Sequence, residues 1–314
     1  MYNKHISSSK IQTIKKILVY LITIGLIFLI VYLLSLKNNK LPSYSSNKSV
    51  GKQTNYTITG VEAGAGMMAN AQQAIKTYGL NKKGWQLQAS STAIMLSQLN
   101  KAIKNRQPIV ITGWTPHWMF VVYRLKFLKD PKKIYGNGEH EDTITRKGFK
   151  QDNPGAYKFL ENFSVQMNKI PSVLRSLKGG ESPQKAAKKY IKQNPTQIKQ
   201  WLKNVPQGKG EKISIGRQSF TYETFITFVA ERVLRNRGYK VTDKQLDPGI
   251  MWQGLVTKSL DSTITAELPV TQKIYARKYK GQYNHVKINL RGARIGLAVP
   301  KYMKNVNSIN DLKK

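Results

Sequence analysis

The folded part of the chain opens with short apolar runs that alternate with segments of helical periodicity. Strands are predicted over 56–61, 85–89 and 108–113, with one helix that ends at Gly79 and a second helix over 92–105 between them. The inward helix faces are expected at Met68, Ala71, Ile75 and Tyr78, and at Ala93, Leu96, Leu99 and Ile103. Because a strand-helix-strand order lays helices on the faces of a sheet, this pattern predicts a parallel α/β sheet that is covered on both faces.

A helical segment and a second alternating region follow. Residues 155–204 consist of apolar stretches broken by Pro and Gly, which predicts consecutive helices. Further strands are expected at 212–216, 239–246, 262–266 and 294–300, and further helices at 223–237 and 249–258. The final segment, 304–314, has the pattern of a helix start with Asn307 or Ser308 as its N-cap. Two α/β units are therefore predicted, with a ligand cleft between them as the default site.

The N-terminal segment contains an uncharged apolar run over 17–36. At about 1.5 Å per residue, a helix of this length crosses a hydrocarbon layer of roughly 30 Å, so we expect a transmembrane anchor. Lysines before the run place residues 1–16 in the cytoplasm and the bulk of the chain outside the cell, as a single-pass protein of the cell membrane. A cleaved signal peptide is the alternative, which the length of the run disfavours. Residues 37–54 are polar and are expected to form a flexible linker.

Charge and cysteine usage restrict the classes of function. The chain has 52 Lys and Arg against 16 Asp and Glu, a net charge of +36. The positive electrostatic field of such a chain favours the binding of polyanions. The alternative interpretation is a solvated, lysine-rich surface without a polyanionic partner. Cysteine is absent, which excludes disulfides, thiol nucleophiles, cysteine metal sites and lipid attachment through an N-terminal cysteine.

Gly64–Ala69 (GAGMMA) follows a predicted strand and opens a predicted helix, as the G-x-G-x-x-G/A dinucleotide pattern does. The acidic ribose partner expected after the next strand is missing, which argues against a dinucleotide. The glycines then indicate either an anion held by the N–H groups of a helix N-terminus or a tight strand-to-helix turn.

The sequence carries no recognised catalytic set: H-E-x-x-H, nucleophile-elbow and P-loop motifs are absent. Glu139–Asp142 (EHED) is expected on a loop, where adjacent side chains point in different directions, so we predict no metal site and no cofactor. His117 is expected to orient its loop or to satisfy backbone groups. We therefore expect a binding protein and not an enzyme.

Three segments resemble the glycine betaine-binding proteins, the extracellular receptors of osmoprotectant ABC transporters. They are 61–68 (VEAGAGMM), 113–149 (beginning GWTPHWMF) and 267–303 (beginning ELPVTQKIY). In many of these receptors the part that resembles 212–314 comes before the part that resembles 55–204, so this chain is similar to the circularly permuted branch. Its short C-terminal segment would ordinarily run on into the first predicted strand, which requires the two ends to lie close together.

The resemblance implies a type II periplasmic-binding-protein fold, in which two α/β lobes close on a ligand about a hinge. We expect lobe 1 to comprise 55–132 and 285–314, and lobe 2 to comprise 133–284. By the same resemblance, backbone N–H groups of Gly66 and Met67 would hold the carboxylate of the ligand, and an aromatic cage would hold its trimethylammonium group.

The expected cage departs from the family pattern on two of its three walls. The first wall is Trp114, whose aromatic face suits a quaternary ammonium. The second tryptophan of the family corresponds to Phe220, with Tyr222 nearby; the third corresponds to Glu267, and a ligand-contacting histidine corresponds to Gln272. Because a carboxylate accepts hydrogen bonds, this cage is expected to favour an ammonium that carries N–H, or a longer or differently shaped cationic osmolyte. If Glu267 instead turns to solvent, betaine would be bound weakly.

The expected function is that of an extracellular solute-binding protein of an ABC importer for glycine betaine or a related quaternary or cationic amine osmolyte. The predicted partners are a small cationic or zwitterionic amine, an ABC permease and, through the N-terminal helix, the membrane; no nucleic acid is expected. The alternative is a diverged surface receptor or polyanion-binding adhesin that no longer binds betaine.

Overall fold

The structure, a computed structural model, describes residues 20–27 and 42–314. Residues 20–27 are helical, and the rest of the anchor expected over 17–36 lies outside the described residues. Within the described ranges, no helix is long and apolar enough to cross a membrane.

The compact unit that contains the sheet begins at Tyr44. Helix α2 (Val50–Gln53) lies inside the segment expected to be a flexible linker. The amide Nε2 of Gln53 donates to the carbonyl oxygens of Ser45 and Lys48, each at 2.9 Å. These side-chain hydrogen bonds order a segment whose polar composition predicts flexibility, so ordered structure begins before residue 55.

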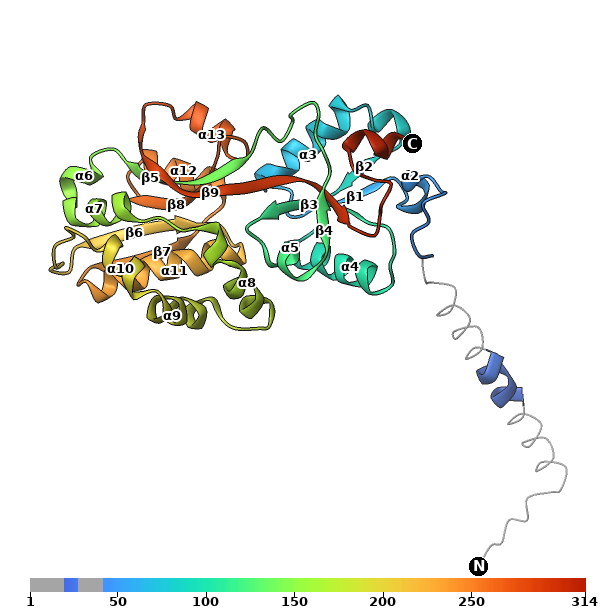
Figure 1. The fold of residues 1–314 in the computed structure, drawn as a ribbon, viewed down its shortest axis with the longest axis horizontal. Helices are drawn as coiled ribbons and strands as arrows, with labels where there is room; N and C mark the ends of the chain where they lie inside the picture. The colour runs from blue at the N-terminus through green and yellow to red at the C-terminus, as the bar shows by residue number, and fades with distance from the viewer. Residues whose placement is uncertain (1–19, 28–41) are drawn as a thin grey trace, which may run out of the picture. The chain divides into compact units, whose positions relative to one another are not determined.

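The strands of this unit form one mixed sheet, in the order β2-β1-β3-β9-β5-β8-β6-β7, with β4 paired to β9 (Figure 1). Their bounds are β1 Thr57–Thr59, β2 Gln86–Gln88, β3 Val110–Thr115, β4 Leu125–Phe127, β5 Glu139–Arg146, β6 Lys212–Arg217, β7 Lys240–Gln245, β8 Ser262–Leu268 and β9 Tyr283–Pro300. The parallel pairing expected in the first region is confirmed for β1 with β2 and β3, and β6 is parallel to β7 and β8. The sheet is not parallel throughout, because β9 runs antiparallel to β3, β4 and β5.

The helices cover this sheet largely where the apolar periodicity places them. They are α3 Gly66–Thr77, α4 Thr92–Lys104, α5 Trp118–Val122, α6 Phe149–Asp152, α7 Pro154–Asn162, α8 Pro171–Lys178, α9 Pro183–Gln193, α10 Pro195–Trp201, α11 Thr221–Asn236, α12 Pro248–Val256 and α13 Lys273–Lys278, with 3₁₀ turns at Asn81–Lys83, Met167–Lys169 and Ile309–Lys313. The consecutive helices expected over 155–204 are confirmed as α7 to α10, each with a proline in its first turn, where a missing N–H costs nothing. The expected inward face of α4 is confirmed at Leu99 and wrong at Ala93, which is exposed; Met95 and Ala102 are buried beside Leu99.

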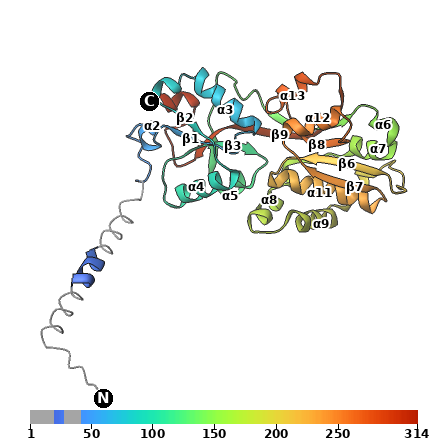
Figure 2. The ribbon, with the colours of Figure 1, turned by 180° about the vertical axis from the view of Figure 1, so that it is seen from behind.

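Strand β9 is shared by two lobes (Figures 1 and 2). Its first part pairs with β5 from Tyr283 to Ala293, and its last part pairs with β3 and β4 from Arg294 to Pro300. We call the half with β1 to β4 the first lobe and the half with β5 to β8 the second lobe. The lobe boundary expected at residue 285 thus falls inside a strand that both lobes share.

The C-terminal segment docks beside the start of the folded unit, and both views show this (Figures 1 and 2). Ser308 is the N-cap of the final turn, as expected, and forms a capping box with Asp311. The indole Nε1 of Trp85 donates to the carbonyl of Leu312 at 2.9 Å, and Ser49 Oγ donates to the carbonyl of Lys314 at 2.8 Å. The two ends of the folded unit are therefore neighbours, as the permuted order requires.

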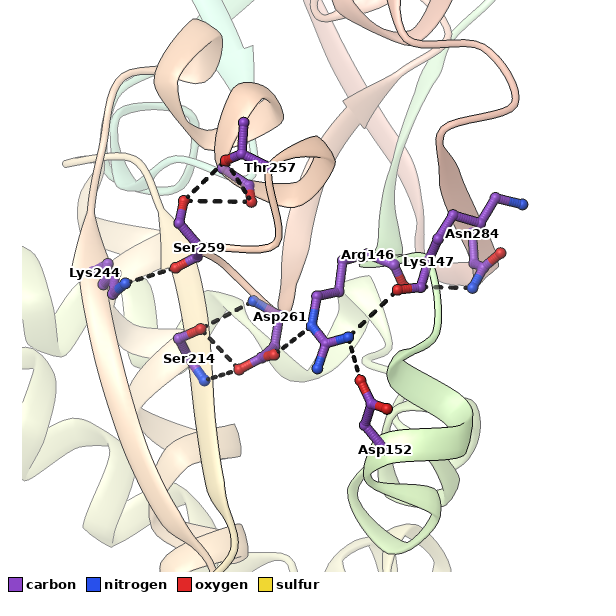
Figure 3. A network of polar contacts seen from close by, with 10 residues as sticks. Arg146, Lys147, Asp152, Ser214, Lys244, Thr257, Ser259, Asp261 and Asn284 are labelled. Carbon is purple, nitrogen blue, oxygen red and sulfur yellow. Dashed lines mark hydrogen bonds and ion pairs between the residues drawn. The ribbon is translucent and has the colours of Figure 1, made fainter.

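A polar network joins β5, β6 and the start of β8 in the second lobe (Figure 3). Asp261 accepts from Arg146 Nε at 2.7 Å, and from Ser214 through its N–H at 2.8 Å and its Oγ at 2.9 Å. Arg146 also pairs with Asp152 at 2.5 Å. One carboxylate therefore links β5 to β6 at the point where β8 begins.

We expect Asp261→Ala to lower the free energy of unfolding by about 2–3 kcal/mol, because it removes the acceptor that Ser214 shares with the Nε of the largely buried Arg146, which retains its pair with Asp152. Urea denaturation of the full-length protein measures this loss. The matched control is Glu161→Ala, which breaks a more exposed Lys158–Glu161 pair and should cost less than about 1 kcal/mol. Equal losses for the two variants would contradict the structural role of Asp261.

Candidate functional site

A narrow pocket lies where the two lobes meet. The first lobe contributes the end of β3, and the second lobe contributes β5, the start of α11 and the end of β8. Its lining residues are Trp114, Thr115, Pro116, Glu139, Glu141, Phe220, Tyr222, Glu223, Glu267, Ala293 and Ile295. The structure thus brings together four of the residues expected at the site, namely Trp114, Phe220, Tyr222 and Glu267.

Trp114 and Phe220 form the aromatic side of this pocket. Their ring centroids are 5.3 Å apart with planes tilted by 47°, and the residues are 4% and 9% exposed. Trp114 sits in β3 opposite Ile295 of β9, and Phe220 is the N-cap residue of α11. Each lobe therefore supplies one aromatic wall, and the two walls touch.

His117 supports Trp114 from behind, in the role expected for it. Its ring centroid lies 4.4 Å from that of Trp114, and its Nδ1 accepts from the backbone N–H of Met119 at 3.2 Å, which caps α5. Burial lowers the pKa of His117 to about 3. The imidazole is therefore neutral at physiological pH and does not repel a cation at the aromatic wall.

Glu267 faces the pocket and does not turn to solvent. Its Oε2 accepts from Nε2 of Gln218 at 3.2 Å and from Nε2 of Gln272 at 3.4 Å. Gln272 is buried and is oriented in turn by Trp252, whose Nε1 donates to its Oε1 at 2.7 Å. Gln272 thus lies behind Glu267 and outside the pocket lining, where it positions the carboxylate.

Three further carboxyls line the same pocket, and the sequence interpretation missed them as site residues. Glu139 and Glu141 lie on β5, in the segment expected to be a loop, and Glu223 lies in the first turn of α11. The loop expectation is wrong because pairing with β8 and β9 makes this segment a central strand. The spacing of the two β5 glutamates, two positions apart, was the signal that could have placed them in one site, since alternate residues of a strand share a face.

The expected carboxylate site, Gly66 and Met67, begins α3 and lies outside this pocket. Glu139 fixes Thr271 by accepting from its N–H at 2.6 Å and its Oγ1 at 2.7 Å. Gly66 packs against this same Thr271, since a Cβ on Gly66 would lie 2.5 Å from the Thr271 carbonyl oxygen. The N-cap Ala65 provides no side-chain hydrogen bond to the start of α3.

A wider cavity adjoins the pocket, because Phe220 lines both. Its lining includes Gly64 and Ala65 from the first lobe and Ser219 and Asp247 from the second. The loop before α3 therefore borders the inter-lobe space, next to the aromatic wall.

Burial is the largest cause that raises the pKa of each of the four carboxyls. Neighbouring carboxylates raise the pKa values of Glu141 and Glu267 further. For Glu223, hydrogen bonds from Gln218 partly offset burial, and its pKa is raised to about 7. The carboxyls of this pocket therefore keep their protons to a higher pH than exposed carboxyls do.

We expect the ligand-free protein to lose stability as pH rises from 5 to 8. The unfolded chain releases the Glu223 proton near pH 4.5, whereas the folded chain keeps it until about pH 7, so the stabilisation is lost as pH rises through the folded pKa. Glu223→Gln cannot titrate and should lose less stability over this range, by at most about 3 kcal/mol. Urea denaturation at pH 5, 6.5 and 8 measures the difference, with Glu161→Gln as a surface control. The same pH profile for the Glu223 variant and the wild type would contradict the raised pKa.

Comparisons with known proteins identify the family. Residues 36–193 and 211–314 match the family described as the substrate binding domain of the ABC-type glycine betaine transport system. The chain is 45% identical over 293 residues to the glycine betaine/carnitine transport binding protein GbuC of Listeria monocytogenes, a match that covers 93% of this chain and 98% of that protein.

Two solved structures are also similar over part of their length. The lactococcal OpuAC complexed with glycine betaine is 37% identical, covers 52% of this chain and 64% of its own, and has a TM-score of 0.43. A glycine betaine/L-proline-binding protein from Borrelia burgdorferi is 28% identical, covers 55% and 63%, and has a TM-score of 0.44. The family match and the full-length relative suffice without them: the chain belongs to the family of substrate-binding proteins of ABC-type glycine betaine transport systems.

Proposed function

We propose that this protein is a membrane-tethered, extracellular binding protein that delivers a small cationic or zwitterionic amine to an ABC permease, without a chemical step of its own. The observation that carries the proposal is one pocket between the lobes that is lined by three aromatic side chains and four carboxyls. Aromatic faces and carboxylates both attract a cation. The name of the Listeria relative, a glycine betaine/carnitine binding protein, supports an amine of this kind.

The cationic end of the ligand binds against Trp114, Phe220 and Glu267, with Tyr222 beside them. Its carboxylate, where it has one, points to the N–H groups of Gly66 and Met67, which the adjoining cavity and the uncapped start of α3 support. Gln272 acts indirectly, by orienting Glu267. Since these groups come from both lobes, a bound ligand bridges them and stabilises the closed state that the permease recognises.

Isothermal titration of the full-length protein with glycine betaine, carnitine, choline, proline betaine and their partly methylated analogues tests this function. Saturable binding of at least one of them is expected. Absence of heat with every compound, together with salt-sensitive binding to an anionic polymer, would instead support the polyanion-binding surface receptor.

We expect Trp114→Ala to reduce ligand affinity by at least about 100-fold, because it removes one aromatic wall and opens the pocket to water. The matched control is Trp118→Phe. Trp118 packs against His117 and Tyr123 outside the pocket, so this variant should retain affinity within about threefold. Titration of both variants measures the contrast, and equal losses would show that Trp114 acts only through packing.

We expect Glu267→Trp to move the preference toward glycine betaine, because an aromatic face replaces a hydrogen-bond acceptor. Glu267→Ala should weaken every amine that the wild type binds, by about tenfold or more. Competition titration with glycine betaine and its partly methylated analogues gives both results. Unchanged affinities for Glu267→Ala would place the carboxylate outside the site.

A further inference from the structure

Two polar atoms at the base of the pocket have no hydrogen-bond partner. They are Oε2 of Glu141 and the hydroxyl oxygen of Tyr222, in residues that are 4% and 2% exposed. Both residues line the same pocket, from β5 and α11 respectively. A buried polar group without a partner costs about 1–3 kcal/mol, so natural proteins retain such groups where something else completes them.

The other carboxyls of the pocket are supplied with donors by the protein. Glu139 accepts from Thr271, Glu223 accepts from the N–H and the side-chain amide of Gln218, and Glu267 accepts from Gln218 and Gln272. Glu141 differs from them, because no side chain of the pocket donates to its Oε2. The protein thus supplies hydrogen-bond donors to the carboxyls around Glu141 but none to Oε2 of Glu141 itself.

The pocket lining contains neither Lys nor Arg, so no side chain of the lining can form an ion pair with Glu141. A bound cation can. A trimethylammonium group presents only C–H groups, and it would leave Glu141 Oε2 and the Tyr222 hydroxyl without conventional hydrogen bonds. An ammonium that keeps one or more N–H groups supplies the missing donor together with the charge.

We propose that this pocket selects amines that carry at least one N–H on the charged nitrogen over their quaternary analogues, with Glu141 and Tyr222 as the residues that make the choice. The inference rests on the proposed function, since it takes the pocket to be the ligand site, and it names the class of ligand. Trp114 and Phe220 then contact the remaining alkyl groups of the nitrogen.

The surroundings of Glu141 imply that binding also displaces protons. The groups that act on it are Glu139 and Asp142 from β5, Glu223 from α11 and Glu267 from β8, all of them acidic. Arg217 of β6 acts on Glu223 but is already paired with Asp243. Burial and these neighbours raise the pKa of Glu141, and an entering ammonium lowers it again because it stabilises the carboxylate, so binding at a pH where Glu141 is protonated releases a proton to the buffer.

Two methylation series test the selectivity on the full-length protein. The first is glycine betaine, N,N-dimethylglycine, sarcosine and glycine; the second is choline, N,N-dimethylethanolamine, N-methylethanolamine and ethanolamine. In at least one series, a partly methylated member should bind about tenfold or more tightly than the quaternary member. Tightest binding by the quaternary member in both series would overturn the inference while leaving the proposed function intact, and no binding in either series would overturn both.

Two conservative variants test the residues. Glu141→Gln and Tyr222→Phe should each weaken the best N–H amine by about tenfold and change the quaternary analogue by less than about threefold. Tyr190→Phe is the matched control, because its hydroxyl is bonded to Gln197 away from the pocket, and it should change neither ligand. Equal loss for both ligands in the pocket variants would overturn the assignment.

The proton count provides a readout that begins with the wild-type protein. Titration of the best N–H amine at pH 6, 7 and 8, in buffers of different ionisation enthalpy, should give net proton release at one or more of these pH values. The release should decrease in Glu141→Gln, with thermal unfolding used to check that this variant is folded. Proton release that is absent in the wild type, or unchanged in Glu141→Gln, would contradict the exchange.

Discussion

The pairing of β9 with both β3 and β5 is the constraint on which the pocket depends. In one continuous strand, Ile295 lies opposite Trp114 and Leu290 lies opposite Glu141. The aromatic wall of one lobe and the acidic base of the other are thus set at a distance fixed by strand register. A slip of one residue in either pairing would turn these side chains to the opposite face of the sheet.

The acidic residues of the pocket oppose the net positive charge of the whole molecule. Four of only 16 acidic residues meet in one pocket, in a chain of net charge +36. Their burial is costly, and the protein offsets the cost with donors from Gln218, Gln272 and Thr271. A basic exterior repels small cations at long range, so recognition relies on short-range contacts that salt screens weakly.

Local sequence patterns predicted most of the fold, because the periodicity of a helical face or an apolar strand can be read from residues that are close together in the sequence. The long helix α11 and the capped C-terminal turn illustrate this. Strand β5 was missed because its polar residues are buried by partners far away in the chain. For the site, the family resemblance pointed to Trp114, Phe220 and Glu267. The lack of a donor to Oε2 of Glu141 could not be predicted, because it depends on where the side chains of Gln218 and Thr271 point, and no local sequence pattern contains that information.

The docking of the C-terminal turn beside α2 has a mechanical consequence. Ser49 and Lys314 both belong to the first lobe, and the second lobe is joined to it through crossing segments such as β9 and through contacts such as that of Trp114 with Phe220. A force applied at Ser49 or Lys314 therefore acts directly on the first lobe, and it reaches the second lobe through β9 and the contacts that line the pocket.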